Sequence, residues 1–270
     1  MEAIYDDHPL VASRAIRSLS QYLNSNVASA LAPMAADERL AVKLEAISTL
    51  NRGWRLLDPE NLQLLEDRKQ DYLDWLKLLA DDPFSYYNLG VFRMDEGRPE
   101  EALDAYAQSE ALGFEETPLY VNWGMALDQT GDSEGAEDKF LKALQRDPRF
   151  AEGHFALGLL YAARPNGLGK AIQSLERAVA IKSDFARAHY NLGLAYNQAG
   201  RALEAVRSLR RAMAADPTMF EAPYALATIY YAAQQWDRAR EAALQALAIQ
   251  PESREAWALL DELERRQAQP

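Results

Sequence analysis

The chain has 270 residues, of which 49% are hydrophobic, so it can bury a sizeable core and does not have the composition of a disordered chain. Its net charge of −12 argues against nucleic-acid binding, which requires a basic surface. The absence of cysteine excludes disulfides, zinc–thiolate sites and covalently attached haem within these residues. No apolar run approaches the roughly 18 residues of a membrane span, and no signal peptide is visible. We therefore expect a soluble chain without membrane insertion.

Two segments near the N-terminus share a pattern at an offset of 31 residues, DDHPLVASRAIRSL (6–19) and DERLAVKLEAISTL (37–50). Matching valine, alanine and leucine positions are Val11, Ala15 and Leu19 in the first segment and Val42, Ala46 and Leu50 in the second. Residues 27–36 between them are predicted to form a short helix. This pattern resembles short HEAT-like helical repeats, and the resemblance implies packed helix pairs over residues 1–57.

Only MEAIYDDH precedes the first of these segments, which leaves the predicted stripe of 9–20 without a helix to cover it. The C-terminal helix, in contrast, has a charged outer face that suits a solenoid cap. This asymmetry favours a chain cut from a longer protein at an engineered boundary. The alternative is that 9–20 is itself an N-terminal cap.

Residues 58–82 are predicted to form one amphipathic helix that bridges this segment to the rest of the chain. The sequence ENLQLLEDRKQDYLDWLKLLADDP covers 60–83. Its apolar residues recur at helical spacing. The predicted apolar face consists of Leu64, Tyr72, Trp75, Leu76 and Leu79.

A twelve-residue phrase then recurs along the chain. YYNLGVFRMDEG begins at Tyr86 and HYNLGLAYNQAG at His189, which is 103 residues later and equals three periods of about 34. Related phrases begin at 120, 154 and 223, and each is followed by a small residue, a bulky residue and Ala or Ser at i, i+4 and i+7, except that the fifth copy has Ala243 in place of the bulky residue. This order predicts a helical hairpin repeated five times.

The fourth copy indicates how such a hairpin packs. Gly193 should let the second helix approach closely, and Gly200 should end the first helix because glycine tolerates positive φ. The second helix has its own small and bulky face, centred on Leu209. Asp216-Pro217 should end it, because the residue before proline avoids the helical region.

This pattern resembles the tetratricopeptide repeat family, with repeats at 83–116, 117–150, 151–185, 186–219 and 220–253 and a capping helix in 254–270. The third copy has one extra residue in its turn, the first has Phe114 where a closing proline is usual, and the fifth has Ala227 for glycine. The resemblance implies an all-α fold, a right-handed superhelix or α-solenoid. Repeat positions are counted below from the first residue of each copy.

No constellation in the sequence indicates catalysis or a cofactor. GLGKA (167–171) lacks the glycine, the Ser or Thr and the preceding strand of a phosphate-binding loop, so it is interpreted as a turn. His154 and His189 share repeat position 4, where adjacent copies could bring them together, but two histidines without further ligands favour packing over a metal site. We expect no enzyme activity, no cofactor and no metal.

In tetratricopeptide superhelices the first helix of each hairpin lines a concave groove through positions 2, 5, 6, 9, 12 and 13. The residues predicted to form a peptide- or protein-binding groove are Tyr87, Asn88, Val91, Asn122, Met125, Phe155, Leu159, Arg187, Tyr190, Asn191, Leu194, Tyr224, Thr228 and Tyr231. Acidic residues, including Asp95, are interspersed among them. The asparagines at position 6 could form a ladder that bonds the backbone of an extended peptide.

These features predict a non-enzymatic scaffold whose protein or peptide partner is neutral to basic. Acidic C-terminal tails of chaperones are not expected to bind, because the basic clamp that the family uses for them is incomplete in every frame. In repeats one to three its places hold Tyr87, Val91, Asn122, Glu152 and Ala156. Self-association through the groove or the cap remains open.

A second interpretation concerns the order of segments. HEAT-like repeats, a bridging helix and tetratricopeptide repeats together resemble the C-terminal part of bacterial multihaem c-type cytochromes. That resemblance implies an interaction module of a larger electron-transfer protein, with the haem sites outside this chain. The location would then be periplasmic or extracellular, and otherwise cytoplasmic.

Overall fold

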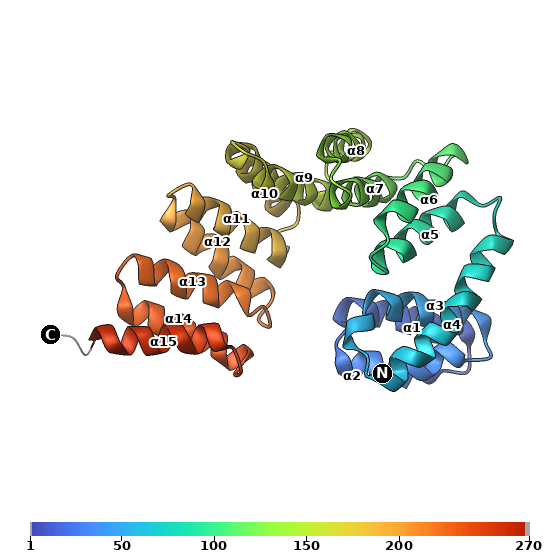
Figure 1. Cartoon of the computed structure of the whole chain (residues 1–270), viewed down its shortest axis with the longest axis horizontal. Coiled ribbons are helices and arrows are strands. Elements are labelled where there is room, and N and C mark those ends of the chain that lie inside the picture. The colour runs from blue at the N-terminus through green and yellow to red at the C-terminus, as the bar shows by residue number, and fades with distance from the viewer. Residues whose placement is uncertain (1, 268–270) are drawn as a thin grey trace. The chain divides into compact units, whose positions relative to one another are not determined.

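The computed structural model describes residues 2–267, and these residues form helices and turns without any β-strand. The predicted all-α class is therefore confirmed. The chain divides into two compact units, one ending at Asp132 and the other beginning at Ser133 (Figure 1). This division lies in the turn of the second predicted repeat, whereas the sequence suggested organisational boundaries at 57 and 82. Each unit is described separately below.

The first unit begins with short helices and ends with the first predicted repeat and half of the second. Its elements are a 3-10 helix Glu2–Tyr5, α1 (Pro9–Leu19), a 3-10 turn Ser20–Tyr22, α2 (Ser25–Leu31), a 3-10 helix Ala32–Ala36, α3 (Leu40–Arg52), a 3-10 turn Trp54–Leu56, α4 (Pro59–Leu78), α5 (Pro83–Asp95), α6 (Pro99–Ala111) and α7 (Thr117–Gln129).

Local sequence explains where α4 and α5 begin. The side chain of Asp58 accepts a hydrogen bond from the backbone N–H of Asn61, and Asp82 accepts one from Phe84. In both helices proline occupies the first turn, where its missing N–H has no helical partner to lose. The pattern Asp-Pro therefore starts these helices and separates them at 79–82.

The predicted equivalence of the two N-terminal segments is wrong for α1. Val42, Ala46 and Leu50 of α3 are fully buried, whereas Val11 of α1 is 44% exposed. The helix α3 contacts α1, α4, α5 and the 3-10 helix Ala32–Ala36, so it buries a wide face. Because α1 packs chiefly on α3 and on the 3-10 helix Glu2–Tyr5, it buries the narrower pair Ala12 and Ile16.

The apolar face predicted for α4 needs one correction. Leu79 lies beyond the last residue of the helix, where the helical spacing no longer applies, and it is exposed. Leu65, which was not predicted, is fully buried, together with Tyr72 and Leu76. The ring of Tyr72 stacks on Phe92 of α5 at a centroid distance of 4.9 Å, so α4 and α5 share one hydrophobic core.

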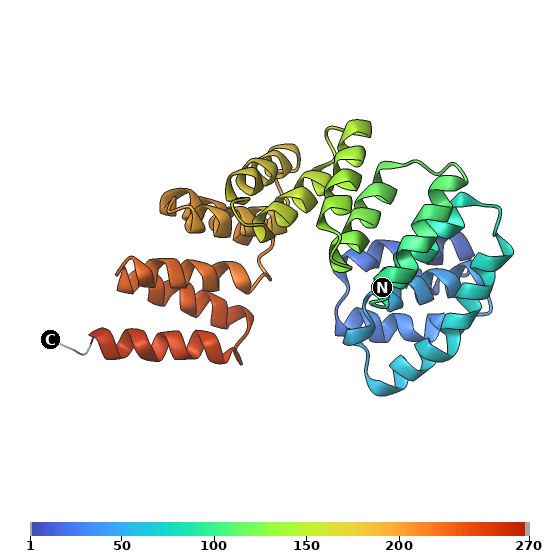
Figure 2. The same ribbon diagram turned by 45° about the horizontal axis from the view of Figure 1, so that its top comes forward.

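The second unit is a series of helices of nearly equal length. Its elements are α8 (Ser133–Arg146), α9 (Ala151–Ala163), α10 (Leu168–Ile181), α11 (Ala186–Gln198), α12 (Ala202–Ala215), α13 (Glu221–Ala232), α14 (Trp236–Ile249) and α15 (Arg254–Gln267). Helix α9 pairs with α10, α11 with α12 and α13 with α14, and each pair packs on the next (Figure 1, Figure 2). Such a stack is an α-solenoid, in which each hairpin buries its apolar face on its neighbours.

Gly193 and Gly200 act as the sequence predicts. A Cβ on Gly193 would lie 2.7 Å from Cγ of Leu209 on α12, which is too close for any side chain. Gly200 has φ of +73° and follows the end of α11, where its freedom from Cβ strain permits the turn. These two glycines therefore set the spacing and the turn of the α11–α12 hairpin.

Candidate functional site

The structure places the predicted groove residues on the first helix of each hairpin. In the first unit they lie on α5 and α7: Tyr87, Asn88, Val91, Asn122 and Met125. In the second unit they lie on α9, α11 and α13: Phe155, Leu159, Arg187, Tyr190, Asn191, Leu194, Tyr224, Thr228 and Tyr231. All of them are at least partly exposed. We call this set the inner-helix face of each unit.

In the first unit the inner-helix face contains a pocket of about 330 Å³. Its lining residues are Arg52, Tyr87, Val91, Met94, Asp95, Tyr106, Asn122, Met125 and Gln129. Four of these, Tyr87, Val91, Asn122 and Met125, belong to the predicted groove. Sequence reasoning missed Arg52 because it belongs to the N-terminal segment, and it missed Tyr106 because a bulky residue on the second helix was assigned to the core.

The polar groups of this pocket are only partly paired. Nε of Arg52 lies 3.8 Å from Oδ2 of Asp95. Burial raises the pKa of the Asp95 carboxyl to about 6, and the nearby Arg52 offsets this effect only in part. The side-chain amide of Asn122 donates a 3.0 Å hydrogen bond to the hydroxyl of Tyr87, whose pKa is also raised by burial. The hydroxyl of Tyr106 is buried and has no hydrogen-bond partner within residues 2–267.

In the second unit the inner-helix face is more apolar. Leu159 and Leu194, both at repeat position 9, are 40% and 38% exposed. Phe155 packs against Phe185 with ring centroids 4.9 Å apart. Tyr190 is half-buried and packs against the hydrophobic core of this unit. Burial raises the pKa of Tyr190, with a smaller contribution from Glu221. The aromatic rings and exposed leucines on α9 and α11 therefore offer a contact surface whose side chains lose little conformational entropy when a partner binds.

In the second unit, three predicted groove residues already use their polar groups within the chain, as Asn122 and Tyr87 do in the first unit. The amide of Asn191 donates to the carbonyl of Arg187 in its own helix, and the hydroxyl of Thr228 donates to Ala225. The hydroxyl of Tyr231 donates to Glu262 of α15 at 3.2 Å. The side-chain amide groups of Asn122 and Asn191 thus both donate a hydrogen bond within the chain. Their side-chain oxygens can still accept hydrogen bonds from a bound peptide.

The two histidines at position 4 do not meet. Nε2 of His154 donates to the carbonyl of Pro148 at 3.0 Å, and Nε2 of His189 donates to Ser183 at 2.9 Å. Trp257, at the same position of α15, donates from Nε1 to Pro251 at 2.9 Å. Each ring therefore reaches the carbonyl six residues earlier and ties a helix start to the turn before it.

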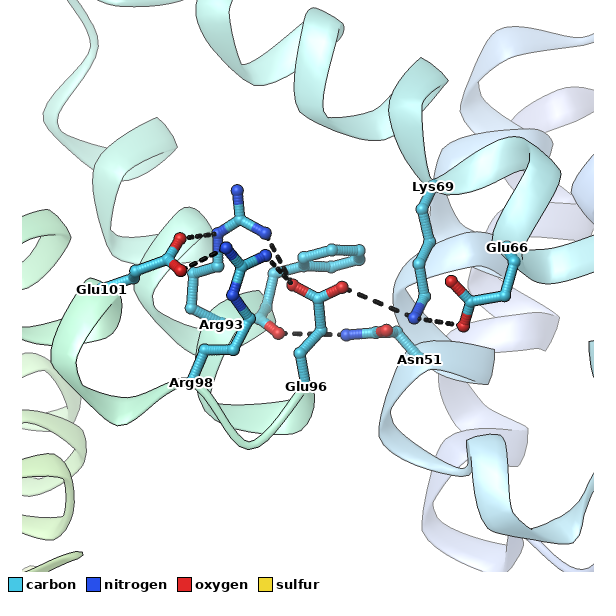
Figure 3. Close-up of polar contacts among 8 residues, drawn as sticks. Asn51, Glu66, Lys69, Arg93, Glu96, Arg98 and Glu101 are labelled. Carbon is cyan, nitrogen blue, oxygen red and sulfur yellow. Dashed lines mark hydrogen bonds and ion pairs between the residues drawn. The ribbon is translucent and has the colours of Figure 1, made fainter.

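A network of charged residues joins α4 to the α5–α6 hairpin (Figure 3). Glu96 pairs with Arg93 at 2.7 Å, Lys69 at 3.4 Å and Arg98 at 3.7 Å. Glu66 and Glu101 complete it on either side, and Asn51 of α3 donates to the carbonyl of Phe92. Every cation here has a carboxylate partner, so the arrangement positions helices and leaves no reactive group free.

Within residues 2–267, no three histidine or carboxylate side chains gather as a metal site would require. Over the same residues, no helix combines the length and the apolar character needed to cross a bilayer.

Comparison with known proteins identifies the repeats. Two family models described as tetratricopeptide repeat match residues 117–150 and 196–263, and one described as TPR repeat matches 166–200. Among curated proteins, human protein O-mannosyl-transferase TMTC3 is 26% identical over 142 residues, which are 51% of this chain and 15% of TMTC3. The chain thus corresponds to a small part of that relative.

Solved structures show the same fold at low identity. PilF of Pseudomonas aeruginosa aligns with a TM-score of 0.60 at 16% identity, covering 81% of this chain and 97% of PilF. YrrB, described as a TPR protein with an unusual peptide-binding site, aligns with a TM-score of 0.53 at 22% identity, covering 69% of this chain and 95% of YrrB.

The hairpins are stacked, and a glycine lies at the close contact between the two helices in the first, third and fourth predicted repeats. These features define the fold as an α-solenoid of helical repeats. The family matches then specify the repeat: residues 117–150 and 166–263 contain tetratricopeptide repeats. Proteins of this kind generally serve as scaffolds for protein partners, through the extended surfaces that stacked repeats create.

Proposed function

We propose that the inner-helix face binds an extended segment of a protein partner, which would make the chain a non-enzymatic interaction scaffold. The observation that carries this proposal is the recurrence of exposed apolar side chains at position 9. Met125, Leu159 and Leu194 are 44%, 40% and 38% exposed on α7, α9 and α11, although their helices offer buried positions on either side.

The aromatic residues on the same helices support this proposal. Tyr190 and Phe155 have rings that are partly exposed and held by neighbouring side chains, which is the condition of a binding hot spot. The peptide-binding site ascribed to YrrB provides a precedent in a protein of similar fold. The net charge of −12 favours a neutral or basic segment over an acidic one.

The negative net charge also disfavours the binding of acidic chaperone tails. The clamp that holds such tails needs basic residues at three places, which in repeats one to three hold Tyr87 on α5 and Glu152 and Ala156 on α9. We expect no measurable binding of an acidic C-terminal tail peptide by calorimetry.

The test is selection of unstructured peptides from a displayed library with the full chain, followed by titration of the selected peptides. Tyr190→Ala should weaken their binding by about 1–3 kcal/mol, because truncation removes a hot-spot ring. The matched control is Leu203→Ala on α12, whose side chain is 74% exposed on a second helix.

The Leu203→Ala variant should bind like the original chain, and both variants should unfold near the original midpoint. Equal binding by the two variants would reject the inner-helix face as the binding surface. A large loss of stability in Tyr190→Ala with unchanged binding would instead assign Tyr190 to the core.

A further inference from the structure

The pocket of the first unit holds a polar group with unmet hydrogen-bonding capacity. Tyr106 is fully buried, and its hydroxyl has no partner among the described residues. Leaving such a buried group unpaired is unfavourable, because it has lost its hydrogen bond to water. Although it is buried, Tyr106 also contributes to the wall of the pocket, so a molecule bound there can supply the missing bond.

The negative charge of a carboxylate in the same pocket is only partly compensated by nearby cations. The side chain of Asp95 is only 21% exposed, and its one ion pair is with Arg52 at 3.8 Å. The side chain of Arg52 is itself 53% exposed, so much of its charge is solvated at the rim. Buried carboxylates are ordinarily compensated by closer or more numerous donors. The pocket therefore favours a ligand that brings a cation to Asp95.

The remaining walls suit an alkyl chain. Val91, Met94 and Met125 are apolar, and the two methionines are flexible enough to follow a narrow stem. The rings of Tyr87 and Tyr106, whose centroids are 6.3 Å apart, also line the pocket, and aromatic rings attract cations. A side chain with an apolar stem and a compact positive end matches both sets of walls.

We propose that this pocket receives a lysine side chain of the protein partner, with its ammonium group between the carboxylate of Asp95 and the hydroxyl of Tyr106. This assignment rests on the proposed function, since it specifies one contact of the inner-helix face of the first unit. It also gives Arg52 a role, because a residue outside the repeats then forms part of the binding pocket.

Two other ligands are chemically conceivable and serve as alternatives in the test. A neutral amide could bond Asp95 and Tyr106 without supplying charge. A carboxylate could pair with Arg52, but the adjacent Asp95 would repel it. The experiment compares three probes of similar length: n-butylammonium, butyramide and butyrate.

The readout is the NMR spectrum of the full chain labelled at its methionine methyl groups. Met94 and Met125 line the pocket, whereas Met213 and Met219 belong to the second unit and report non-specific effects. We expect n-butylammonium to shift the Met94 and Met125 signals saturably and to bind about tenfold more tightly than butyramide. Saturation should also lower the measured pKa of the Asp95 carboxyl.

Asp95→Asn should abolish the preference for n-butylammonium, whereas Asp104→Asn, which removes an exposed carboxylate from α6, should leave it unchanged. The proposal is overturned if butyramide or butyrate binds as well as n-butylammonium, or if no probe shifts Met94 and Met125. Peptides selected on the Tyr190 surface would then still support the proposed function. If n-butylammonium binds but no peptide is selected from the library, the proposed function is refuted, and the pocket is still shown to bind a cation.

Discussion

Arg52, the last residue of α3, lies 3.8 Å from Asp95, the last residue of α5. This pair connects the N-terminal segment to the first hairpin, yet it does not fully compensate the carboxylate, since burial still raises the pKa of Asp95 to about 6. The ordinary pKa of 3.8 applies to the unfolded chain. Between these two values the folded state binds more protons, so stability falls as pH rises from about 4 to about 6.

Replacing Asp95 by Asn should therefore stabilise the protein by about 1–2 kcal/mol at pH 8, because it removes the cost of a buried charge. The gain should disappear below pH 4, where the carboxyl is protonated in both states. Urea unfolding at the two pH values measures this difference, with Asp104→Asn as the control. A destabilised Asp95→Asn variant at pH 8 would show that the pair with Arg52 outweighs burial.

Gln234 adopts the left-handed backbone conformation that glycine adopts at the same repeat position elsewhere. Its φ is 56°, compared with 73° at Gly97 and Gly200. A residue with a Cβ pays roughly 1 kcal/mol for this conformation. We expect Gln234→Gly to raise the free energy of unfolding by about that amount, and Gly200→Ala to lower it similarly.

Thermal unfolding measures both changes. The control for the loss of a side chain is Gln235→Gly, because Gln235, the N-cap of α14, has a backbone conformation outside the left-handed region. If Gln234→Gly is no more stable than the original chain, the positive φ carries no strain.

His189 should make stability depend on pH. Burial lowers its pKa from the ordinary 6.5; the bond to Ser183 opposes this shift and Arg211 adds to it. Its Nδ1 is buried and has no hydrogen-bond partner in the described part of the chain, so a proton there would find no acceptor among these residues. The unfolded state then binds the proton more readily, and this contribution to stability is lost as pH falls below about 6.5.

The variant His189→Phe, which keeps a ring at position 4, should show less loss of stability between pH 7 and pH 5 than the original chain. NMR titration of the imidazole signals should place the pKa of His189 below 6.5. A value above 6.5 would contradict the role assigned to burial.

Glu96 should be the most sensitive member of the network in Figure 3. Its side chain is 13% exposed and pairs with Lys69, Arg93 and Arg98. Glu96→Gln leaves these cations with fewer carboxylates, and we expect a loss of about 1–3 kcal/mol. Urea unfolding in low and high salt measures it. A loss no larger than that of Asp104→Asn would mean that the network is solvated.

The repeated part of the chain could be predicted because each hairpin follows local rules. Gly193 and Leu209 meet in space because their spacing places them on facing helices, and Gly200 ends a helix by its own backbone freedom. Such relationships lie within one repeat, so a single copy contains the information. The placement of the groove residues on first helices follows from the same register.

Contacts between distant segments could not be predicted in this way. Val11 and Val42 match in sequence but differ in burial, because the number of helices around α1 and α3 differs. Arg52 reaches Asp95 only through the packing of α3 on α5. Tyr231 occupies a groove position, but its hydroxyl bonds to Glu262 of a helix that lies outside the repeats.

The ring hydrogen bonds at position 4 imply that the turns of this chain differ in how they tolerate a change of length. Pro148 and His154 are linked across the turn between hairpins, as are Ser183 and His189, so an inserted residue there would break the bond. The extra residue of the third copy lies instead in the turn within a hairpin, next to Asn166, whose φ is 60°. We therefore expect inserted residues to be tolerated in the turns within hairpins and to be destabilising in the turns between hairpins.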